Sequence, residues 1–240
     1  MNVLLILAFL FFIGSNIGWV LELVFRRFFS LSNPERKWIN PGFCVGPYVP
    51  LYGFGLCILY LIASLNYNKA VLFFIMAVCM TAIEYIAGIL LLKLFKTRLW
   101  DYSAMRFNVQ GLICPQFSLI WAGMGAVYYF CIHPHILDAL SWLSENLAFS
   151  FFVGMFFGVF IIDVAYSSQI LVRLRRFAKE NSFEVKYEHL KAHIRSLRDR
   201  DNKKRSFLFA FHSEFDITEH LKEMLSEVRD ELEEKIKKKL

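Results

Sequence analysis

Long apolar stretches make up most of the first 172 residues of the chain, and no such stretch follows residue 172. Each carries little or no charge and reaches roughly 20 residues, which is enough to cross ~30 Å of hydrocarbon as an α-helix. The predicted spans are residues 3–25, 46–66, 70–92, 109–132 and 147–172. The pattern therefore predicts an all-α fold, a polytopic membrane bundle of five transmembrane helices embedded in the lipid bilayer.

The composition agrees with a membrane protein. Hydrophobic residues make up 57% of the chain and 26 residues are phenylalanine, whereas soluble domains are usually about 45–50% apolar. The first span is longer than the apolar part of a signal peptide, follows no basic residue and precedes no convincing cleavage site. We expect it to remain in the protein as a span.

The basic residues predict the orientation of the spans. The connections after the first, third and fifth spans are rich in lysine and arginine, whereas 66–69 holds only Lys69 and 133–146 holds no basic residue. The clusters are Arg26, Arg27, Arg36 and Lys37; Lys93, Lys96, Arg98 and Arg106; and Arg173, Arg175, Arg176 and Lys179. Because such clusters remain in the cytoplasm, we expect the N-terminus outside the cell membrane and the C-terminus inside.

The chain divides into a transmembrane bundle, 1–172, and a charged cytoplasmic tail, 173–240. The tail contains most of the charged residues and no glycine or proline, so we expect it to be largely helical. A solvated helix with one apolar stripe is one interpretation, and a helix that docks on a partner or pairs with a copy is the other.

Two carboxylates are predicted near the middle of the membrane. Glu84 lies nine residues before Lys93 and Asp163 ten residues before Arg173, or roughly 13–15 Å from the cytoplasmic end. A charge at that depth costs at least ~2.5–3.5 kcal/mol. Each acid should therefore face the bundle interior, pair with another group or stay protonated, and a neutral acid hydrogen-bonded between helices is the structural alternative. The partners nearest in sequence are Thr81 and Tyr85 for Glu84, and Tyr166, Ser167 and Gln169 for Asp163.

Small residues form stripes on three of the predicted spans. Gly14 and Gly18 lead at four-residue steps to Glu22, which is one turn from Arg26. The fourth span has such a stripe from Gly111 to Gly125, and the fifth has Gly154 and Gly158. Because small residues let helices approach closely, we expect spans one, four and five to pack tightly.

The stretch PGFCVGPYVPLYGFG, 41–55, places prolines and glycines where the second span begins. Broken helix at membrane depth is tolerated only inside protein or beside a wet cavity. We predict a broken or re-entrant start to this span, whose freed backbone groups face a ligand or polar side chains. The alternative is a helix that begins at a proline near the head groups.

The connection LWDYSAMRFNVQGLICPQ, 99–116, is predicted on the same cytoplasmic side. Trp100 and Tyr102 have the character of interface anchors. If this connection meets the segment 41–55, Asp101 and Arg106 can pair with Arg26 or Glu22 in a polar cluster that leads toward Glu84. The candidate pocket residues are Glu22, Arg26, Gly46, Pro47, Pro50, Tyr52, Gly53, Glu84, Trp100, Asp101, Tyr102, Asn108, Gly111 and Asp163.

Several of these motifs together carry a family resemblance. They are GWVLE at 18–22, GPYVPLYGFG at 46–55, Glu84 with Gly88, WDYS at 100–103 and NVQGLIC at 108–114. In this order they resemble the CmpB/TMEM229 family, whose bacterial members carry the label ABC-transporter permease, type IV. The resemblance covers residues 1–172 and leaves the tail outside. It implies a permease-like protein, and it supplies no substrate and no catalytic residue.

Other motifs limit the chemistry that we expect. No GxxxxGK[ST] loop occurs, so a transporter of this kind would need a separate ATP-hydrolysing subunit. Five spans are few for a solute pathway, which favours a homo-oligomer or a further partner. We expect no catalytic residue, cofactor or metal: GxSxG and HExxH are absent, the five cysteines lack CxxC spacing, and His133 and His135 flank a proline on an outer loop. Nothing indicates nucleic-acid binding.

Three functions remain as hypotheses. The first is a transport-related or ligand-binding membrane component with a cytoplasm-facing polar pocket. The second is a non-catalytic scaffold or regulator that acts through its tail. The third is an intramembrane enzyme acting on lipid, with Glu22, Glu84 or Asp101 as acid or base.

Overall fold

The computed structural model describes residues 2–30, 33, 36–180, 185–186, 191 and 226. Most of the described residues are helical, and the described strands are two short ones of two residues each, which confirms the predicted helical fold. The helices are α1 (Val3–Phe28), α2 (Pro50–Ala63), α3 (Lys69–Phe95), α4 (Pro115–Val127), the π-helical turn η1 (Tyr128–Ile132), α5 (His133–Glu145), the 3-10 turn η2 (Leu147–Phe149) and α6 (Ser150–Glu180). The strands β1 (Thr97–Arg98) and β2 (Val185–Lys186) pair in parallel.

Local signals determine where the helices begin. The side chains of Asn2 and Asn68 accept hydrogen bonds from the first-turn amides of α1 and α3, which satisfies donors that lack a partner inside the helix. Pro50 and Pro115 stand at the first turns of α2 and α4, where a missing N–H costs nothing. The second and fourth apolar stretches therefore become helical later than their hydropathy alone predicts.

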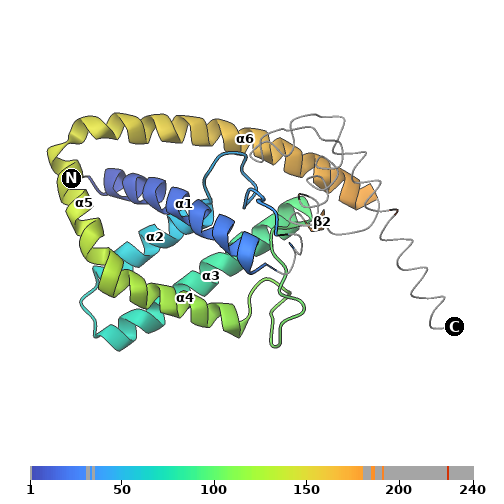
Figure 1. The fold of residues 1–240 in the computed structure, drawn as a ribbon, viewed down its shortest axis with the longest axis horizontal. Helices are drawn as coiled ribbons and strands as arrows, with labels where there is room; N and C mark the ends of the chain where they lie inside the picture. Colours follow the sequence, from blue (N-terminus) through green and yellow to red (C-terminus); the bar gives the residue numbers. More distant parts are fainter. Residues whose placement is uncertain are drawn as a thin grey trace.

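Helices α1 to α4 pack side by side, α5 closes one end and α6 runs along α1 (Figure 1). Leu10, Met76, Tyr128 and Leu143 are fully buried in the core that joins these helices. The contact between α1 and α6 is aromatic, since the ring of Phe11 lies within 5.5 Å of the rings of both Phe157 and Phe160.

Three helical segments are long and apolar enough to cross a membrane: α1, α3 and Leu147–Val172. By contrast, α2 has 14 residues and α4 has 13 before η1 adds five more. Crossing by these two remains a prediction. Helix α6 continues without interruption through residue 172, where the sequence placed the start of the tail. Most of the predicted helical tail, 173–240, lies outside the described residues.

The glycine stripes differ in what they contact. A Cβ on Gly18 would lie 2.2 Å from the Cβ of Tyr52, and one on Gly14 would lie 2.8 Å from the Cβ of Leu56. The glycines of α1 therefore let α2 approach closely, as small residues do in membranes. Gly125 likewise faces Met76 of α3, whereas Gly154 and Gly158 of α6 have no atom within 4 Å. The prediction that the fifth span packs tightly on its glycines is wrong, because α6 contacts α1 through phenylalanine rings.

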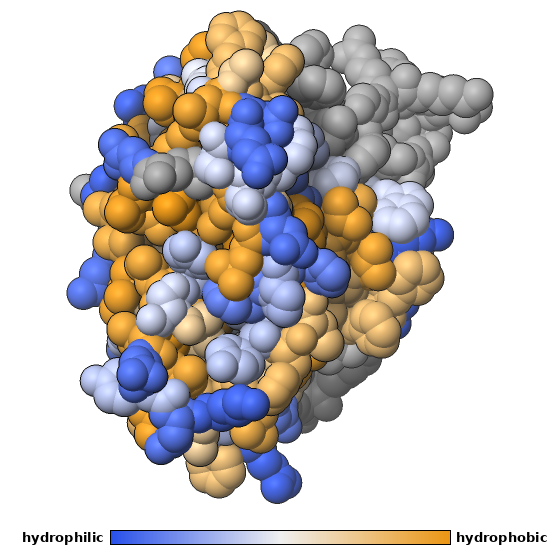
Figure 2. Space-filling view, turned by 90° about the vertical axis from the view of Figure 1, so that its left-hand side faces the viewer, coloured by the Kyte–Doolittle hydropathy of each residue, from blue (hydrophilic) through white to orange (hydrophobic). Residues whose placement is uncertain are grey.

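The connections with basic clusters lie at one end of the molecule. In Figure 1 the described residues 36–49 and 96–114 lie between the middle and the right of the molecule, and the N-terminus, the turn between α2 and α3, and α5 are at the left. Figure 2 looks onto this left end, where polar and apolar residues are intermixed. Residues 64–70 of the turn are all exposed there.

Candidate functional site

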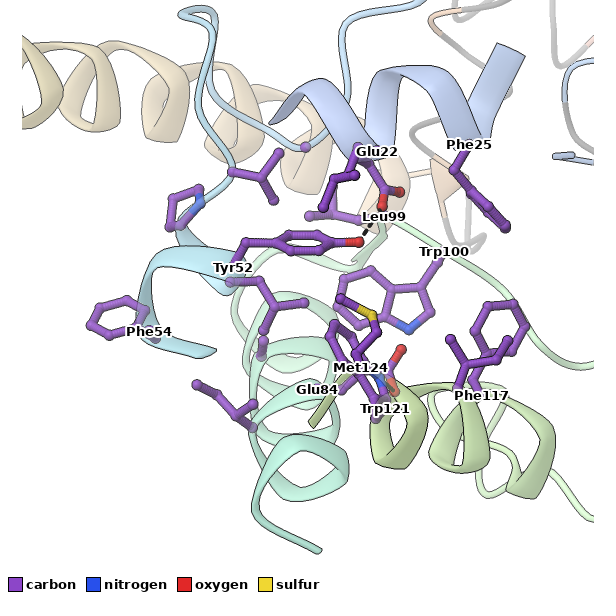
Figure 3. A pocket seen from close by; sticks show the side chains of 18 of the residues that line it. Glu22, Phe25, Tyr52, Phe54, Glu84, Leu99, Trp100, Phe117, Trp121 and Met124 are labelled. Atoms are coloured by element: carbon purple, nitrogen blue, oxygen red, sulfur yellow. Dashed lines mark hydrogen bonds between the residues drawn. The ribbon is translucent and has the colours of Figure 1, made fainter. Parts of the chain in front are cut away.

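A cavity of about 1080 Å³ lies between α1, α2, α3, α4 and the segment that precedes α4 (Figure 3). Apolar side chains make up most of its lining, which differs from the polar pocket that the sequence predicts. The polar exceptions with an ionisable group are Glu22, Arg26, Tyr52, Glu84 and Tyr102.

Glu84 is buried, with 3% of its surface exposed. It belongs to the face of α3 that repeats every four residues and packs against the other helices: Leu72, Met76, Met80, Glu84 and Gly88. One carboxylate oxygen accepts a hydrogen bond from the Tyr102 hydroxyl and the other from the indole N–H of Trp121, both at 2.9 Å. A buried carboxylate requires such donors.

The segment that follows α3 folds back to bring Tyr102 to Glu84. The Trp100 indole donates to the carbonyl of Leu112 at 2.8 Å, and the Tyr102 N–H donates to the carbonyl of Gly111 at 2.8 Å. The ring of Tyr102 stacks on Phe117 of α4, with centroids 4.3 Å apart. Burial and the Glu84 carboxylate raise the pKa of Tyr102, so the phenol remains a hydrogen-bond donor.

A glycine makes room for this folded segment. A Cβ on Gly88, one turn after Glu84, would lie 3.0 Å from Leu112 and 3.2 Å from Trp100. Gly111 adopts a φ of +69°, which L side chains rarely do, and a Cβ there would lie 2.5 Å from the Ser103 hydroxyl. Both glycines therefore help to position Trp100 and Tyr102 beside the cavity.

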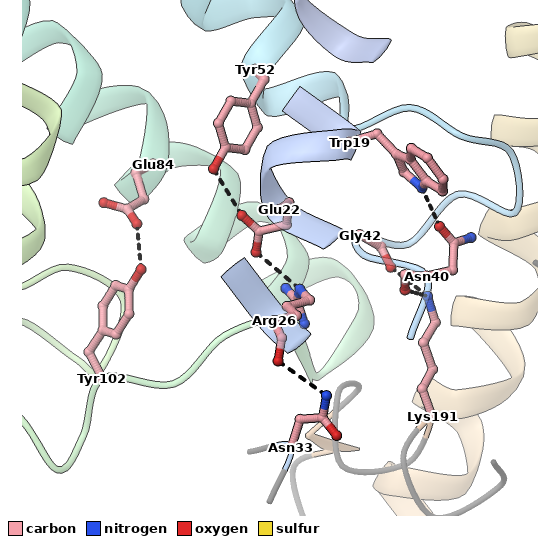
Figure 4. A network of polar contacts seen from close by, with 10 residues as sticks. All are labelled: Trp19, Glu22, Arg26, Asn33, Asn40, Gly42, Tyr52, Glu84, Tyr102 and Lys191. Atoms are coloured by element: carbon pink, nitrogen blue, oxygen red, sulfur yellow. Dashed lines mark hydrogen bonds and ion pairs between the residues drawn. The ribbon is translucent and has the colours of Figure 1, made fainter. Parts of the chain in front are cut away.

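Glu22 forms the second carboxylate of the cavity. Its oxygens accept from the Arg26 guanidinium at 3.0 Å and from the Tyr52 hydroxyl at 2.9 Å (Figure 4). The ring of Tyr52 lies 5.8 Å from that of Trp121. Tyr52 thus contacts one carboxylate directly and packs against a donor to the other.

Asp163 lies outside the lining of the cavity. Its carboxylate accepts from the amides of Val45 and Gly46 at 3.0 and 2.7 Å, from the Ser167 hydroxyl at 2.7 Å, and from the Tyr48 hydroxyl. On the other side of this loop, the Asn40 amide donates to the carbonyls at 44 and 45. Asp163 therefore holds the non-helical segment before α2 through the amides of Val45 and Gly46; a broken or re-entrant crossing by this segment stays a prediction.

Asp101 and Asn108 shape the connection between α3 and α4. The Asp101 carboxylate accepts from the amide and the hydroxyl of Ser103 at 3.0 and 2.5 Å. The Asn108 side chain accepts from the Gly111 amide at 2.9 Å and donates to the carbonyl of Met105 at 2.8 Å. These contacts are local, so both residues act on the cavity through the loop that carries Tyr102.

The fourteen candidate residues divide into two groups. One group lines the cavity: Glu22, Arg26, Pro50, Tyr52, Glu84, Trp100 and Tyr102. The other group lies in the surrounding contacts: Gly46, Pro47, Gly53, Asp101, Asn108, Gly111 and Asp163. Gly53 packs against Phe11, while Pro47 is exposed in the loop before α2.

Sequence reasoning missed Trp121 and Phe117 of α4. It proposed Thr81 and Tyr85 as partners of Glu84, whereas the donors come from positions 18 and 37 residues away. A signal was present, because a tryptophan in the middle of an apolar span must find an acceptor for its N–H. For Asp163 the proposed partner Ser167 does donate.

Among the described residues, no group of three or more histidines, cysteines, aspartates or glutamates is placed to hold a metal. His133 contacts the Tyr128 hydroxyl through Nδ1 at 2.9 Å. Cys44 is buried, with 1% of its surface exposed.

The long apolar helices and the cavity between them define a helical membrane protein with an internal site. The family described as "Putative ABC-transporter type IV" matches residues 9–168. The chain belongs to this family, and the matched residues include Glu22, Glu84 and their donors. No curated protein and no solved structure matches the chain.

Proposed function

We propose that the protein is a transport-related, permease-like membrane component that binds its ligand in the cavity beside Glu84. The observation that carries the proposal is a buried carboxylate held by Tyr102 and Trp121 on the wall of a cavity of about 1080 Å³. Acids at membrane depth are rare and typically mark substrate or ion pathways. The family description points to transport as well.

In the proposed topology the chain crosses the membrane five times, with the N-terminus outside and the C-terminus in the cytoplasm. Helices α1, α3 and α6 have the length to cross on their own. Helices α2 and α4 are shorter, and the segments 41–49 and 109–114 would complete their crossings. The donors supplied to Asp163 by Val45 and Gly46 support this, because non-helical backbone inside a membrane needs internal partners.

We propose a binding and transport role without catalysis and without an ATPase activity of this chain. Among the described residues that line the cavity there is no serine, cysteine or histidine to act as a nucleophile or proton shuttle. ATP hydrolysis would come from a separate subunit. A second copy of this chain is a further candidate partner, since five helices enclose only a small pathway.

Purification of the full-length protein from its own membrane tests this proposal. The expected result is an ATP-hydrolysing subunit in the same complex, with ligand-stimulated hydrolysis that falls when Glu84→Gln is introduced. Glu145→Gln, an exposed acid of α5, is the matched control and should behave like the wild type. A complex without ATPase, in which Glu84→Gln has no effect on any bound small molecule, would contradict the proposal.

A second candidate function, a regulator acting through its tail, is favoured by one contact. The Lys191 ammonium is buried and donates to the carbonyls of Asn40 and Gly42 at 2.9 and 2.8 Å (Figure 4). Asn40 also accepts from the Trp19 indole at 2.6 Å, and Gly42 lines the cavity. A residue beyond α6 therefore contacts the loop beside the site.

Deletion of residues 180–240 distinguishes the two candidates. A regulator or scaffold should lose its function with the tail while Glu84→Gln remains harmless. A ligand-binding transport component should show the reverse, with ligand binding retained after the deletion and lost in Glu84→Gln.

A further inference from the structure

The charges in the cavity are not balanced in the same way around its two acids. Glu22 is paired with the Arg26 guanidinium at 3.0 Å. Glu84 accepts from a phenol and an indole, which are both neutral donors. A positively charged ligand that approached Glu22 would compete with Arg26. Within the described cavity wall, an ionised Glu84 can bind such a ligand without the loss of an ion pair.

Aromatic rings surround the same carboxylate. Figure 3 shows the rings of Tyr52, Trp100, Phe117 and Trp121 in the same pocket as Glu84, and Tyr102, a donor to Glu84, stacks on Phe117. The electron-rich faces of such rings attract cations, especially quaternary and other weakly hydrated ammonium groups. A carboxylate among several rings therefore favours a cationic head group over an anionic one.

The rim of the cavity is apolar and lies on the flanks of the helices. Phe54 of α2, Ile86 of α3 and Ile120 of α4 line the cavity and are 55, 53 and 51% exposed. In the proposed topology these flanks face lipid acyl chains. A ligand with a hydrocarbon part can therefore enter between the helices, with that part against the rim.

We propose that the ligand of this cavity is a cationic amphiphile, whose charged nitrogen or phosphorus centre lies beside Glu84 and whose hydrocarbon contacts the apolar rim. This inference rests on the proposed ligand-binding function and adds the chemical class of the ligand. Two sources share this chemistry: a membrane lipid with a long chain and an amine head group, and a free hydrophobic cation.

Two probe ions of the same shape and opposite charge test the proposal. Labelled tetraphenylphosphonium and tetraphenylborate would be measured by equilibrium dialysis against the purified full-length protein in maltoside micelles. We expect the cation to bind at least about tenfold more tightly than the anion. Glu84→Gln should remove this preference, and Glu145→Gln should keep it.

A second variant, Phe117→Leu, keeps the proposal testable if Glu84→Gln does not fold. Phe117→Leu leaves both donors to Glu84 in place and removes an aromatic face, so cation binding should weaken about threefold to tenfold. Elution as a single peak in size-exclusion chromatography verifies that each variant is folded. Wild-type cation affinity in a folded Glu84→Gln or, if that variant is unfolded, in Phe117→Leu would overturn the proposal.

Competition assigns the source of the cation. Displacement of labelled tetraphenylphosphonium by sphingosine indicates a long-chain lipid amine, and displacement by tetrapropylammonium alone indicates a compact free cation. Either result supports the class of ligand.

The outcomes also separate this inference from the proposed function. Ala87→Phe fills the cavity beside Glu84. Tetraphenylborate binding that equals or exceeds cation binding, and that Ala87→Phe abolishes, would leave a ligand-binding cavity and refute its cation selectivity. Binding of neither ion would refute both.

Discussion

Glu84 and Asp163 are two acids that the sequence places at similar depth, and the structure gives them different environments. Asp163 accepts from two backbone amides and two hydroxyls and holds the loop before α2. Glu84 accepts from two aromatic side chains and lines a cavity. Depth in a membrane span is thus shared by an acid that holds a loop and by an acid that lines a cavity, and under the proposed function only the second acid binds ligand.

The largest expected effect belongs to Asp163→Ala. This change leaves the partly buried amides of Val45 and Gly46 without their acceptor, and an unsatisfied donor that is buried costs about 1–3 kcal/mol. We expect the protein to lose about 3 kcal/mol of stability or more, measured as the temperature at which the monodisperse detergent-solubilised peak disappears. Ser167→Ala removes a single donor from the same carboxylate and should cost about 1 kcal/mol. Equal stability of Asp163→Ala and the wild type would refute the structural role.

Gly18→Ala tests the environment of Glu22, the second acid of the cavity. The added Cβ would overlap Tyr52, which donates to Glu22, and overpacking of this kind costs about 1–3 kcal/mol. The same thermal assay measures it. Gly158→Ala is the matched control on α6, where no atom lies within 4 Å, and should be neutral or slightly stabilising. Similar losses in both variants would show that the close approach of α1 and α2 is not the cause.

Trp121→Phe removes one donor to Glu84 and keeps an aromatic ring. Because Tyr102 still donates to the carboxylate, we expect a loss of about 1–2 kcal/mol. Cation binding should persist, since the ring face remains. A loss as large as that of Asp163→Ala would show that Glu84 is also mainly a structural residue.

Glu84→Gln should have the smallest effect on stability, about 1 kcal/mol or less. The amide keeps an oxygen acceptor for Trp121 or Tyr102 and loses the charge. Thermal stability and tetraphenylphosphonium binding should be measured on the same sample. We expect Glu84→Gln to keep nearly the stability of the wild type and to lose cation binding. For Asp163→Asn the reverse is expected, a clear loss of stability and unchanged binding per folded molecule.

Part of this picture follows from the sequence. The apolar stretches predict α1, α3 and the apolar part of α6, since length and hydropathy are sufficient for long helices. The cost of an ionised group in hydrocarbon predicts that Glu84 is buried. The late starts of α2 and α4 follow from Pro50 and Pro115, which hydropathy alone does not take into account.

Apart from Ser167, which donates to Asp163 as the sequence predicts, the donors to the two acids did not follow from the sequence. Trp121 and Val45 contact Glu84 and Asp163 across 37 and 118 residues, and such contacts depend on how the helices pack. The sequence names Trp100 and Tyr102 both as interface anchors and as pocket candidates, and it does not predict the folded-back loop that brings them to the cavity. The apolar rim likewise depends on the packing of α2, α3 and α4 against one another, which the sequence does not give.

Labelling with dicyclohexylcarbodiimide, a hydrophobic reagent for carboxylic acids, tests the central claim most directly. Peptide mass spectrometry of the detergent-solubilised protein would give the modification rate at each acid, with and without tetraphenylphosphonium. We predict rapid modification of Glu84 that the cation slows, and little modification of Asp163, whose oxygens are held by four donors. Equal rates at the two acids, or an unreactive Glu84, would contradict the assignment of Glu84 to a ligand-accessible cavity.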